Sequence, residues 1–436
     1  MLPITKENLD ATVNRLGIID INTATIRQIC SLAAALEDLS GEHFVHLEIG
    51  NPGLPPEQIG IAAEKDALDS GVANKYPNIN GVKLLKDAGS RFVKAFINLD
   101  VNPKGIVPVV GSMQGSFTMM ELLKFRDPKR DTMLFIMPGF PAQRCQAKVI
   151  GMNIEAFDIY DYRGPKLQDK LEEILKSGRV SGIIYSNPNN PAWTNLTEDE
   201  LKIIGTMATK YDAVVIEDLA YMGMDFRTYT GCPFEGPYVP TVGRYTDNYV
   251  LMVSSSKIFS YAGQRIAFVA ISDKLYDRHF QHMCDFFEMP NFGDCYIYGI
   301  LYVASSGTSH AAQYAMAAML DAACDRKLDF VNNCKEYGRR AEIMKKMFLD
   351  NGFNLTYSED AGKPLADGFF FTASYDHMTG EELHLELMRY GIASIPLYST
   401  GSVQNGVRVC VSAVSTDEEM AKLKERLEAF SKDHKK

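Results

Sequence analysis

The sequence has 436 residues, of which 46% are hydrophobic and 23% are charged, and its net charge is −10. This length and composition are typical of a globular protein of two or three domains and exclude a mostly disordered, fibrous or repeat-only chain. The acidity, with a basic block only in the tail Lys432–Lys436, argues against nucleic-acid binding. No apolar run approaches the roughly 18 residues of a membrane helix, so no membrane partner is expected.

The cysteines indicate a reducing compartment. Eight of them are scattered along the chain, and none forms a Cys-x-x-Cys pair. The N-terminal residues also lack the basic and apolar regions of a secretory signal. We therefore expect reduced thiols and a cytoplasmic location.

Short apolar runs alternate with helical patterns through the middle of the chain. Runs without polar alternation are typical of strands that a parallel sheet buries on both faces. We therefore predict a large α/β domain, residues 49–305, with a mainly parallel seven-stranded sheet flanked by helices. The predicted strands are Ile106–Val110, Thr132–Met137, Ile154–Phe157, Gly182–Tyr185, Ala213–Ile216, Tyr249–Val253 and Ile266–Ile271. Between them, Thr197 and Glu200 have capping-box spacing and predict a helix over Leu201–Lys210.

The two ends of the chain combine helices with a few short strands. Residues 21–40 have helical periodicity that ends at Gly41, and residues 310–348 are also helical. Short strands are predicted at Gly368–Ala373 and Gly406–Ser412, with a charged helix after Thr416. We predict a smaller α+β domain built from residues 1–48 and 306–436.

Lys257 is the first candidate for chemistry. It follows three serines at the end of a buried strand, and it is the only lysine between Lys210 and Lys274. A desolvated lysine has a lowered pKa, and its free amine forms a Schiff base with an aldehyde. The plain alternative is a strand-end lysine that reaches solvent.

Asp218 ends another predicted strand, in the segment Glu217-Asp218-Leu-Ala-Tyr221. Ligands of open α/β sheets bind at the carboxyl ends of the strands. A buried aspartate there needs a cationic partner, and a protonated pyridine nitrogen would serve. A helix N-cap is the alternative.

Three further segments have side chains or amides suited to anions. The turn Gly111–Ser116 follows a predicted strand and opens a helix predicted at Phe117–Phe125, an arrangement that can hold a phosphate or simply cap the helix. Asn187–Pro191 is a rigid turn. Arg408 lies within an apolar strand, where a guanidinium needs an anionic partner such as a carboxylate.

In their order along the chain, these motifs resemble the class I/II aminotransferases, which are pyridoxal-phosphate enzymes of fold type I. The resemblance covers roughly residues 25–430 and depends on the joint match rather than on any one motif. The matching positions are Gly50, Tyr76, residues 111–116, Phe140, Asn190, Asp218, Tyr221, Lys257, Arg265 and Arg408.

The resemblance implies a role for each position. Lys257 is the Schiff-base lysine and proton shuttle, Asp218 the partner of the pyridine nitrogen, and Tyr221 a donor to the cofactor O3′. The other implied cofactor contacts are Asn190 to O3′, Phe140 stacked on the ring, and Ser112, Met113, Gln114, Ser254, Arg265 and Tyr76 around the phosphate. The implied substrate contacts are Arg408 on the α-carboxylate, with Gly50 and Asn190 beside it.

The sequence departs from the family pattern at two places. The family's Asn-Pro-Thr-Gly is here Asn190-Pro-Ala-Trp193, and we expect the only tryptophan to be a packed surface aromatic rather than a pocket wall. Residues 279–325 contain no Arg or Lys, although the dicarboxylate-specific branch has a substrate-binding arginine in that part of the chain. This absence weakens aspartate as the preferred donor. The 228–249 segment is expected to form a long loop near the site.

No metal site is predicted. His279-x-x-His282-x-Cys284 has a spacing that could touch a metal, but no fourth ligand lies nearby in sequence, and a surface helix is the preferred interpretation.

The resemblance implies a transaminase that moves an amino group from an amino acid to a 2-oxo acid by a ping-pong mechanism. A carbon–sulfur β-lyase uses the same lysine and arginine and remains an alternative. A cofactor-binding regulatory protein is disfavoured, because the resemblance begins near residue 25 and leaves no room for a DNA-binding module. The family's counterpart of Tyr76 completes the phosphate site of a second subunit, which implies a homodimer with shared active sites.

Overall fold

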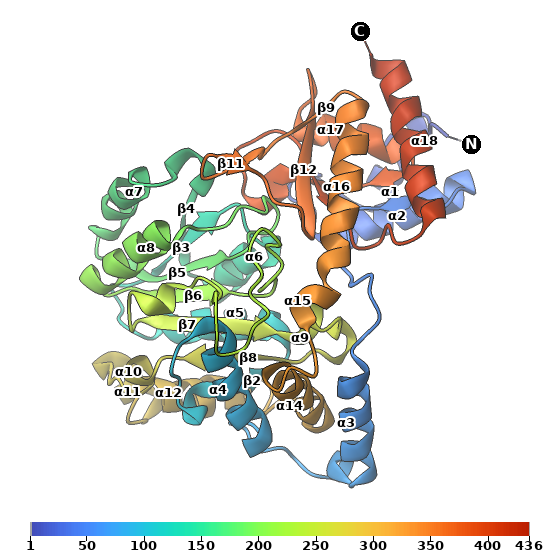
Figure 1. The fold of residues 1–436 in the computed structure, drawn as a ribbon. Coiled ribbons are helices and arrows are strands. Elements are labelled where there is room, and N and C mark those ends of the chain that lie inside the picture. Colours follow the sequence, from blue (N-terminus) through green and yellow to red (C-terminus); the bar gives the residue numbers. More distant parts are fainter. Residues whose placement is uncertain (1, 436) are drawn as a thin grey trace.

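The computed structural model describes residues 2–435, so Met1 and Lys436, the outer limits of the predicted domains, lie outside the described residues. A seven-stranded sheet with the order β2-β8-β7-β6-β5-β3-β4 forms the centre of the large domain (Figure 1). Its strands are β2 (Ile106–Val109), β3 (Thr132–Met137), β4 (Asn153–Asp158), β5 (Val180–Ser186), β6 (Val214–Asp218), β7 (Tyr249–Ser254) and β8 (Ala267–Ile271).

The prediction of a mainly parallel sheet is confirmed. The neighbours from β7 to β4 are all parallel, and only β8 runs against its partners β2 and β7. In this register Ser186 pairs with Asp218, and Asp218 pairs with Met252, so β5, β6 and β7 end at one edge. That edge carries the loops of the candidate site.

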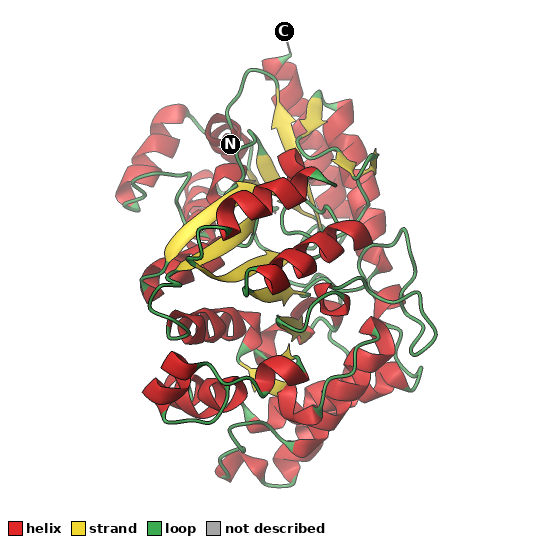
Figure 2. Ribbon diagram, turned by 90° about the vertical axis from the view of Figure 1, so that its left-hand side faces the viewer, coloured by secondary structure: helices red, strands yellow, loops and turns green. Residues whose placement is uncertain are grey.

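Helices cover both faces of the sheet, which explains why the strands are apolar throughout (Figure 2). On one face Val215 and Leu251 pack with α4, α7 and α8. On the other face Ile216 and Val250 pack with α5 and α6. The helices are α4 (Lys83–Ile97), α5 (Gly111–Lys124), α6 (Pro141–Ile150), α7 (Lys166–Leu175) and α8 (Glu198–Lys210).

The predicted capping box of α8 is confirmed. Thr197 Oγ1 accepts from Glu200 N at 3.2 Å, and Glu200 Oε2 accepts from Thr197 N at 2.9 Å. Helix α5, in contrast, begins at Gly111 and not at Phe117, because the Gly–Ser turn expected there is already its first turn.

A smaller antiparallel sheet, ordered β14-β15-β12-β9, forms the centre of the small domain, which also contains the first and the last helix of the described residues (Figure 1). The N-terminal segment joins this part through β1 (Val45–His46), which pairs in parallel with β13 (Ile392–Ala393). This agrees with the predicted α+β unit. Its other elements are α1 (Lys6–Arg15), α2 (Ile26–Ser40), β9 (Phe353–Leu355), β12 (Phe370–Tyr375), β14 (Ile395–Pro396), β15 (Val407–Cys410), α16 (Lys335–Asp350), α17 (Gly380–Arg389) and α18 (Asp417–His434).

Helix α14 (His310–Cys324) packs against α3 (Gln58–Asp69) and α4, at the base of the large domain (Figure 1). The domain boundary at residue 305 stays a prediction. The shorter helices of this region are α9 (Ser255–Ile258), α10 (Asp273–Tyr276), α11 (Gln281–Phe287), α12 (Phe292–Asp294), α13 (Tyr302–Ala304) and α15 (Phe330–Asn333), with a π-helical turn at Cys295–Leu301. Between residues 2 and 435, no helix has the length and apolarity to cross a membrane.

Candidate active site

Lys257 lies in the short helix α9, directly after β7. Ser254 caps this helix, since its Oγ accepts from Ser256 N at 3.2 Å. Lys257 Nζ donates to the carbonyl oxygen of Gly50 and lies 5.4 Å from the centre of the Phe369 ring. Desolvation lowers the pKa of this amine from 10.5 to about 8, so near neutral pH the protonated form still predominates, but the unprotonated fraction is far larger than for an ordinary lysine. Such an amine can attack an aldehyde.

Asp218 is buried at the carboxyl end of β6. Its Oδ1 accepts from Ala220 N at 3.2 Å, and its Oδ2 accepts from Gln143 Nε2 at 3.1 Å. Burial raises the pKa of this carboxyl to about 6. Within residues 2–435 no cationic side chain lies within 4 Å of it, so the carboxylate fits a protonated ring nitrogen.

Gln143 was not predicted from the sequence. It lies in the first turn of α6, three residues after Phe140, and only the packing of α6 on the sheet directs its amide to Asp218.

Arg408 projects from β15 and is only 2% exposed. Its guanidinium donates to the carbonyl oxygen of Glu48 and, at 3.4 Å, to Asn190 Oδ1, and it lies 4.8 Å from the Phe370 ring centre. Among the described residues no carboxylate lies within 4 Å of it. A buried guanidinium held only by neutral acceptors fits the carboxylate of a ligand.

The segment Glu48–Gly50 connects the two cationic side chains. The carbonyl of Glu48 accepts from Arg408, and the carbonyl of Gly50 accepts from Lys257. The fold therefore brings together Gly50, Asn190, Lys257 and Arg408.

Asn190 and Tyr221 complete this cluster. Asn190 N donates to Ser186 Oγ at 3.2 Å at the end of β5, and its side chain also interacts with the hydroxyl of Tyr221. Burial strongly raises the pKa of Tyr221, so the phenol keeps its proton and can donate it in a hydrogen bond.

Arg265 lies against the first turn of α5. Gly111 has a φ of +67°, in the left-handed region that favours glycine, and a side chain there would place Cβ 2.5 Å from Arg265 Nη2, so the guanidinium would have to shift. Ser112 and Met113 follow in the same turn. A guanidinium beside the N-terminus of a helix fits a phosphate group.

Gln114 holds this turn in place. Its Oε1 accepts from Val110 N at 2.8 Å, and its Nε2 donates to Ser305 Oγ at 2.9 Å.

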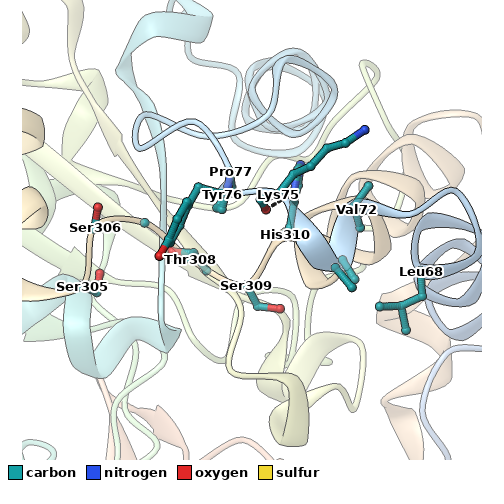
Figure 3. Close-up of a pocket in the computed structure, with 13 residues that line it drawn as sticks. Leu68, Val72, Lys75, Tyr76, Pro77, Ser305, Ser306, Thr308, Ser309 and His310 are labelled. Carbon is teal, nitrogen blue, oxygen red and sulfur yellow. Dashed lines mark hydrogen bonds between the residues drawn. The ribbon is translucent and has the colours of Figure 1, made fainter.

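Phe140 caps α6, and its carbonyl accepts from Gln143 N at 3.1 Å. Tyr76 lies apart from the cluster and is 94% exposed. Its side chain lines a hollow of about 370 Å³ together with the Ser305–His310 segment (Figure 3).

Trp193 is packed, as expected, but it is fully buried and not at the surface. It lies edge-on to Tyr221 and Phe370, at ring distances of 5.6 and 6.1 Å. Its φ of +60° is a left-handed conformation that favours glycine, the residue of the family pattern. Trp193 thus packs against the ring of Tyr221 and helps to hold it in place.

The 228–249 loop does not lie where we expected it. Phe234 N and Val239 N donate to carbonyls of α4, and Thr241 Oγ1 donates to Glu217 Oε2 at 2.6 Å. Glu217 and Asp218 are adjacent in β6 and point to opposite faces of the sheet. The loop therefore covers the face away from the Asp218 side chain.

The His279–Cys284 segment is only partly helical, because α11 begins at Gln281. His279 and His282 each contact a backbone carbonyl, of Pro290 and Phe125. In the described part of the chain no group of three or more His, Cys, Asp or Glu side chains could hold a metal ion.

Known proteins share this fold and sequence pattern. The family described as "Aminotransferase class I and II" matches residues 42–427. The chain is 25% identical to a probable aspartate aminotransferase of Methanocaldococcus jannaschii, over 59% of this chain and 62% of that protein. It is 24% identical to aromatic-amino-acid aminotransferase 2 of Thermococcus litoralis, over 95% of this chain and 97% of that protein.

The match to the Methanocaldococcus protein spans about three fifths of that relative's length. The same holds for an aspartate aminotransferase of Pyrococcus horikoshii, of which 60% is covered. Solved structures agree in fold. An aspartate aminotransferase from Thermotoga maritima superposes with a TM-score of 0.75 at 16% identity, covering 98% of this chain and 99% of that one. A double mutant of Thermus thermophilus aspartate aminotransferase superposes with a TM-score of 0.74 at 17% identity, covering 96% of this chain and 98% of that one. The chain belongs to the class I and II aminotransferases, the fold-type-I proteins whose cofactor is pyridoxal phosphate.

Proposed function

We propose that the protein is a transaminase that moves an amino group from an amino acid to a 2-oxo acid by a ping-pong mechanism. The observation that carries this proposal is the cluster of the buried Asp218 and Arg408 with the half-buried Lys257, three ionisable groups that no ion pair neutralises within residues 2–435. The cluster offers a nucleophilic amine, a carboxylate for a ring nitrogen and a guanidinium for a substrate carboxylate. The relatives named above are aminotransferases, and this supports a transaminase rather than the β-lyase alternative.

In this proposal Lys257 holds the cofactor and moves the proton of the substrate Cα. Bound pyridoxal phosphate supplies an electron sink for the bonds at that carbon. Asp218 keeps the ring nitrogen protonated, and Asn190 and Tyr221 donate to O3′. The remaining cofactor contacts are Phe140 on the ring, and Ser112, the Met113 amide, Gln114, Ser254 and Arg265 around the phosphate.

Arg408 binds the α-carboxylate of the substrate. Its two neutral acceptors, Glu48 O and Asn190 Oδ1, orient the guanidinium without neutralising it. Gly50 forms the opposite side, where its carbonyl already contacts Lys257. Amino acid and 2-oxo acid thus use one site in turn.

The active unit of the proposal is a homodimer in which Tyr76 contacts the phosphate bound by the partner subunit. The 94% exposure of Tyr76 supports this, because such an aromatic is free to be covered by a second copy. All eight cysteines are free thiols, which supports a cytoplasmic location.

A half-reaction screen tests the function. Each amino acid is mixed with the cofactor-loaded protein in the absence of an oxo acid. A transaminase loses the visible absorbance of the cofactor once per site, and a 2-oxo acid then restores it. Continuous release of ammonia from a β-substituted amino acid, without an oxo acid, would instead establish the β-lyase. No spectral change with any amino acid would contradict both.

A further inference from the structure

Asp360 is a carboxylate of the small domain that lies within an ion network of the large domain. It belongs to the hairpin of β10 (Glu359–Asp360) and β11 (Lys363–Pro364) and is only 3% exposed. Its Oδ1 accepts from Arg163 Nη1 at 2.9 Å, and its Oδ2 accepts from Arg227 Nη2 at 2.6 Å. Both oxygens also accept from Asn195 N at 3.1 Å.

These contacts fix the far ends of two loops that reach the active site. Asn195 ends the loop of Asn190, and Arg163 Nη2 also donates to Asn195 O at 2.8 Å. Arg227 follows Tyr221 by six residues, and Asp225 binds its guanidinium through both oxygens, at 2.9 and 2.7 Å. One carboxylate thus joins the loops that carry Asn190 and Tyr221.

The hairpin is itself held on the large domain. Figure 1 shows β11 extending from the small domain toward β4 and α7. Three residues before Asp360, the fully buried Tyr357 donates its hydroxyl to Asp158 Oδ2 at the end of β4. The hairpin therefore holds Asp360 in a defined position on the large domain, and both loops are hydrogen-bonded to it there.

We propose that Asp360 is a positioning residue of the cofactor site, which holds Asn190 and Tyr221 in place through Asn195 and Arg227. This inference rests on the proposed function, because it assigns Asn190 and Tyr221 to the cofactor. Asp360 does not touch the cofactor or the substrate in this proposal.

Both arginines keep a second carboxylate partner when Asp360 is replaced, which limits the loss of stability. Arg163 keeps both oxygens of Glu200, at 2.7 and 2.9 Å, when Asp360 is neutralised. Arg227 likewise keeps Asp225. Asp360→Asn retains one acceptor oxygen, whereas Asp360→Ala removes both.

The test compares Asp360→Asn and Asp360→Ala with Glu359→Gln, which removes the same charge from the exposed neighbouring position. The first readout is the dissociation constant of pyridoxal phosphate from the apoprotein. The second is quenching of Trp193, the only tryptophan, which follows Asn190 by three residues and packs on Tyr221. Acrylamide is the quencher, and circular dichroism verifies the fold.

We expect Asp360→Ala to bind the cofactor about tenfold more weakly, with Trp193 more accessible to acrylamide. For Asp360→Asn, the dissociation constant and the quenching should lie between those of Asp360→Ala and those of the control. If Asp360→Ala does not fold, Asp360→Asn alone is compared with the control. Asp360 variants indistinguishable from Glu359→Gln in both readouts would overturn the inference while leaving the function intact. A wild-type chain that binds no pyridoxal phosphate would overturn the function and this inference with it.

Discussion

Lys257, Asp218 and Arg408 are ionisable side chains that the fold desolvates without an ion-pair partner within residues 2–435. Burying a charge without a counter-charge costs several kcal/mol per group. The arrangement is reasonable if ligands complete it: a ring nitrogen for Asp218, a carboxylate for Arg408, and an aldehyde for Lys257. These three side chains therefore form a site whose charges are neutralised only when its ligands bind.

Asp218→Asn should reduce turnover about a hundredfold or more while the cofactor stays bound. An amide has the shape of the carboxylate but cannot keep the ring nitrogen protonated. Steady-state kinetics of the loaded variant measures the effect. Gln143→Leu, which removes one hydrogen bond and leaves the carboxylate, is the matched control and should lose far less. Near-normal turnover of Asp218→Asn would refute this role.

Attachment of the cofactor to the apoprotein should follow the protonation of Lys257. Desolvation, with smaller contributions from Arg408 and Arg265, lowers the pKa of this amine from 10.5 to about 8. The reactive free amine therefore accumulates as pH rises to about 8, and the rate should level off above that value. Stopped-flow absorbance across this pH range measures it.

Arg408→Gln is the matched control for this pH profile. Removing a nearby cation favours the protonated amine, so the midpoint should move to higher pH. A wild-type rate that keeps rising to pH 10, as for an ordinary lysine, would show that the amine is not desolvated.

Helix α8 shows how a local sequence signal fixes an element near the site. Its capping box satisfies the backbone N–H groups of Thr197 and Glu200. Thr197→Ala should lower the free energy of unfolding by about 1 kcal/mol, which lowers the melting temperature by about 2 °C. Lys202→Ala, on the exposed side of the same helix, is the control. Equal melting temperatures for the two variants would mean that the cap contributes nothing.

The strands of the large sheet could be predicted because each signal is local. Strands covered on both faces are continuous apolar runs, and all seven predicted runs overlap observed strands. The largest errors are at the start of β5 and the end of β6, each two residues from the prediction, because the polar residues Ser181, Glu217 and Asp218 interrupt the apolar signal there.

Contacts between distant segments could not be predicted from local patterns. The predicted start of α5 is wrong because Gly111 and Ser112 have a turn composition, although Gly111 serves the left-handed backbone there and the close approach of Arg265. Gln143 and Asp360 carry no motif at all. Their positions depend on how α6 and the β10–β11 hairpin dock on the large domain.

At the scale of the whole molecule, the two sheets meet around the site. Asp218 ends a strand of the large sheet, Lys257 lies in the short helix that follows the next strand, and Arg408 lies in a strand of the small sheet. Tyr76 is exposed in the single chain, so the proposed dimer is what gives it a ligand.

Co-expression of Tyr76→Ala and Lys257→Ala chains should restore activity that neither variant has alone. Each mixed dimer contains one site with both defects and one with neither, because a two-fold interface makes the contact reciprocal. Random pairing predicts about a quarter of the wild-type activity. No recovery in mixed dimers, or a fully active monomer by light scattering, would contradict shared sites.

Borohydride reduction of the cofactor-loaded protein, followed by peptide mapping, identifies the amine that holds the cofactor. Reduction fixes the cofactor to the amine that holds it. We expect the label on Lys257, and we expect Lys257→Ala to fold, to take no label and to have no turnover. Labelling of Lys210 or Lys274, or a labelled and active Lys257→Ala, would contradict this assignment.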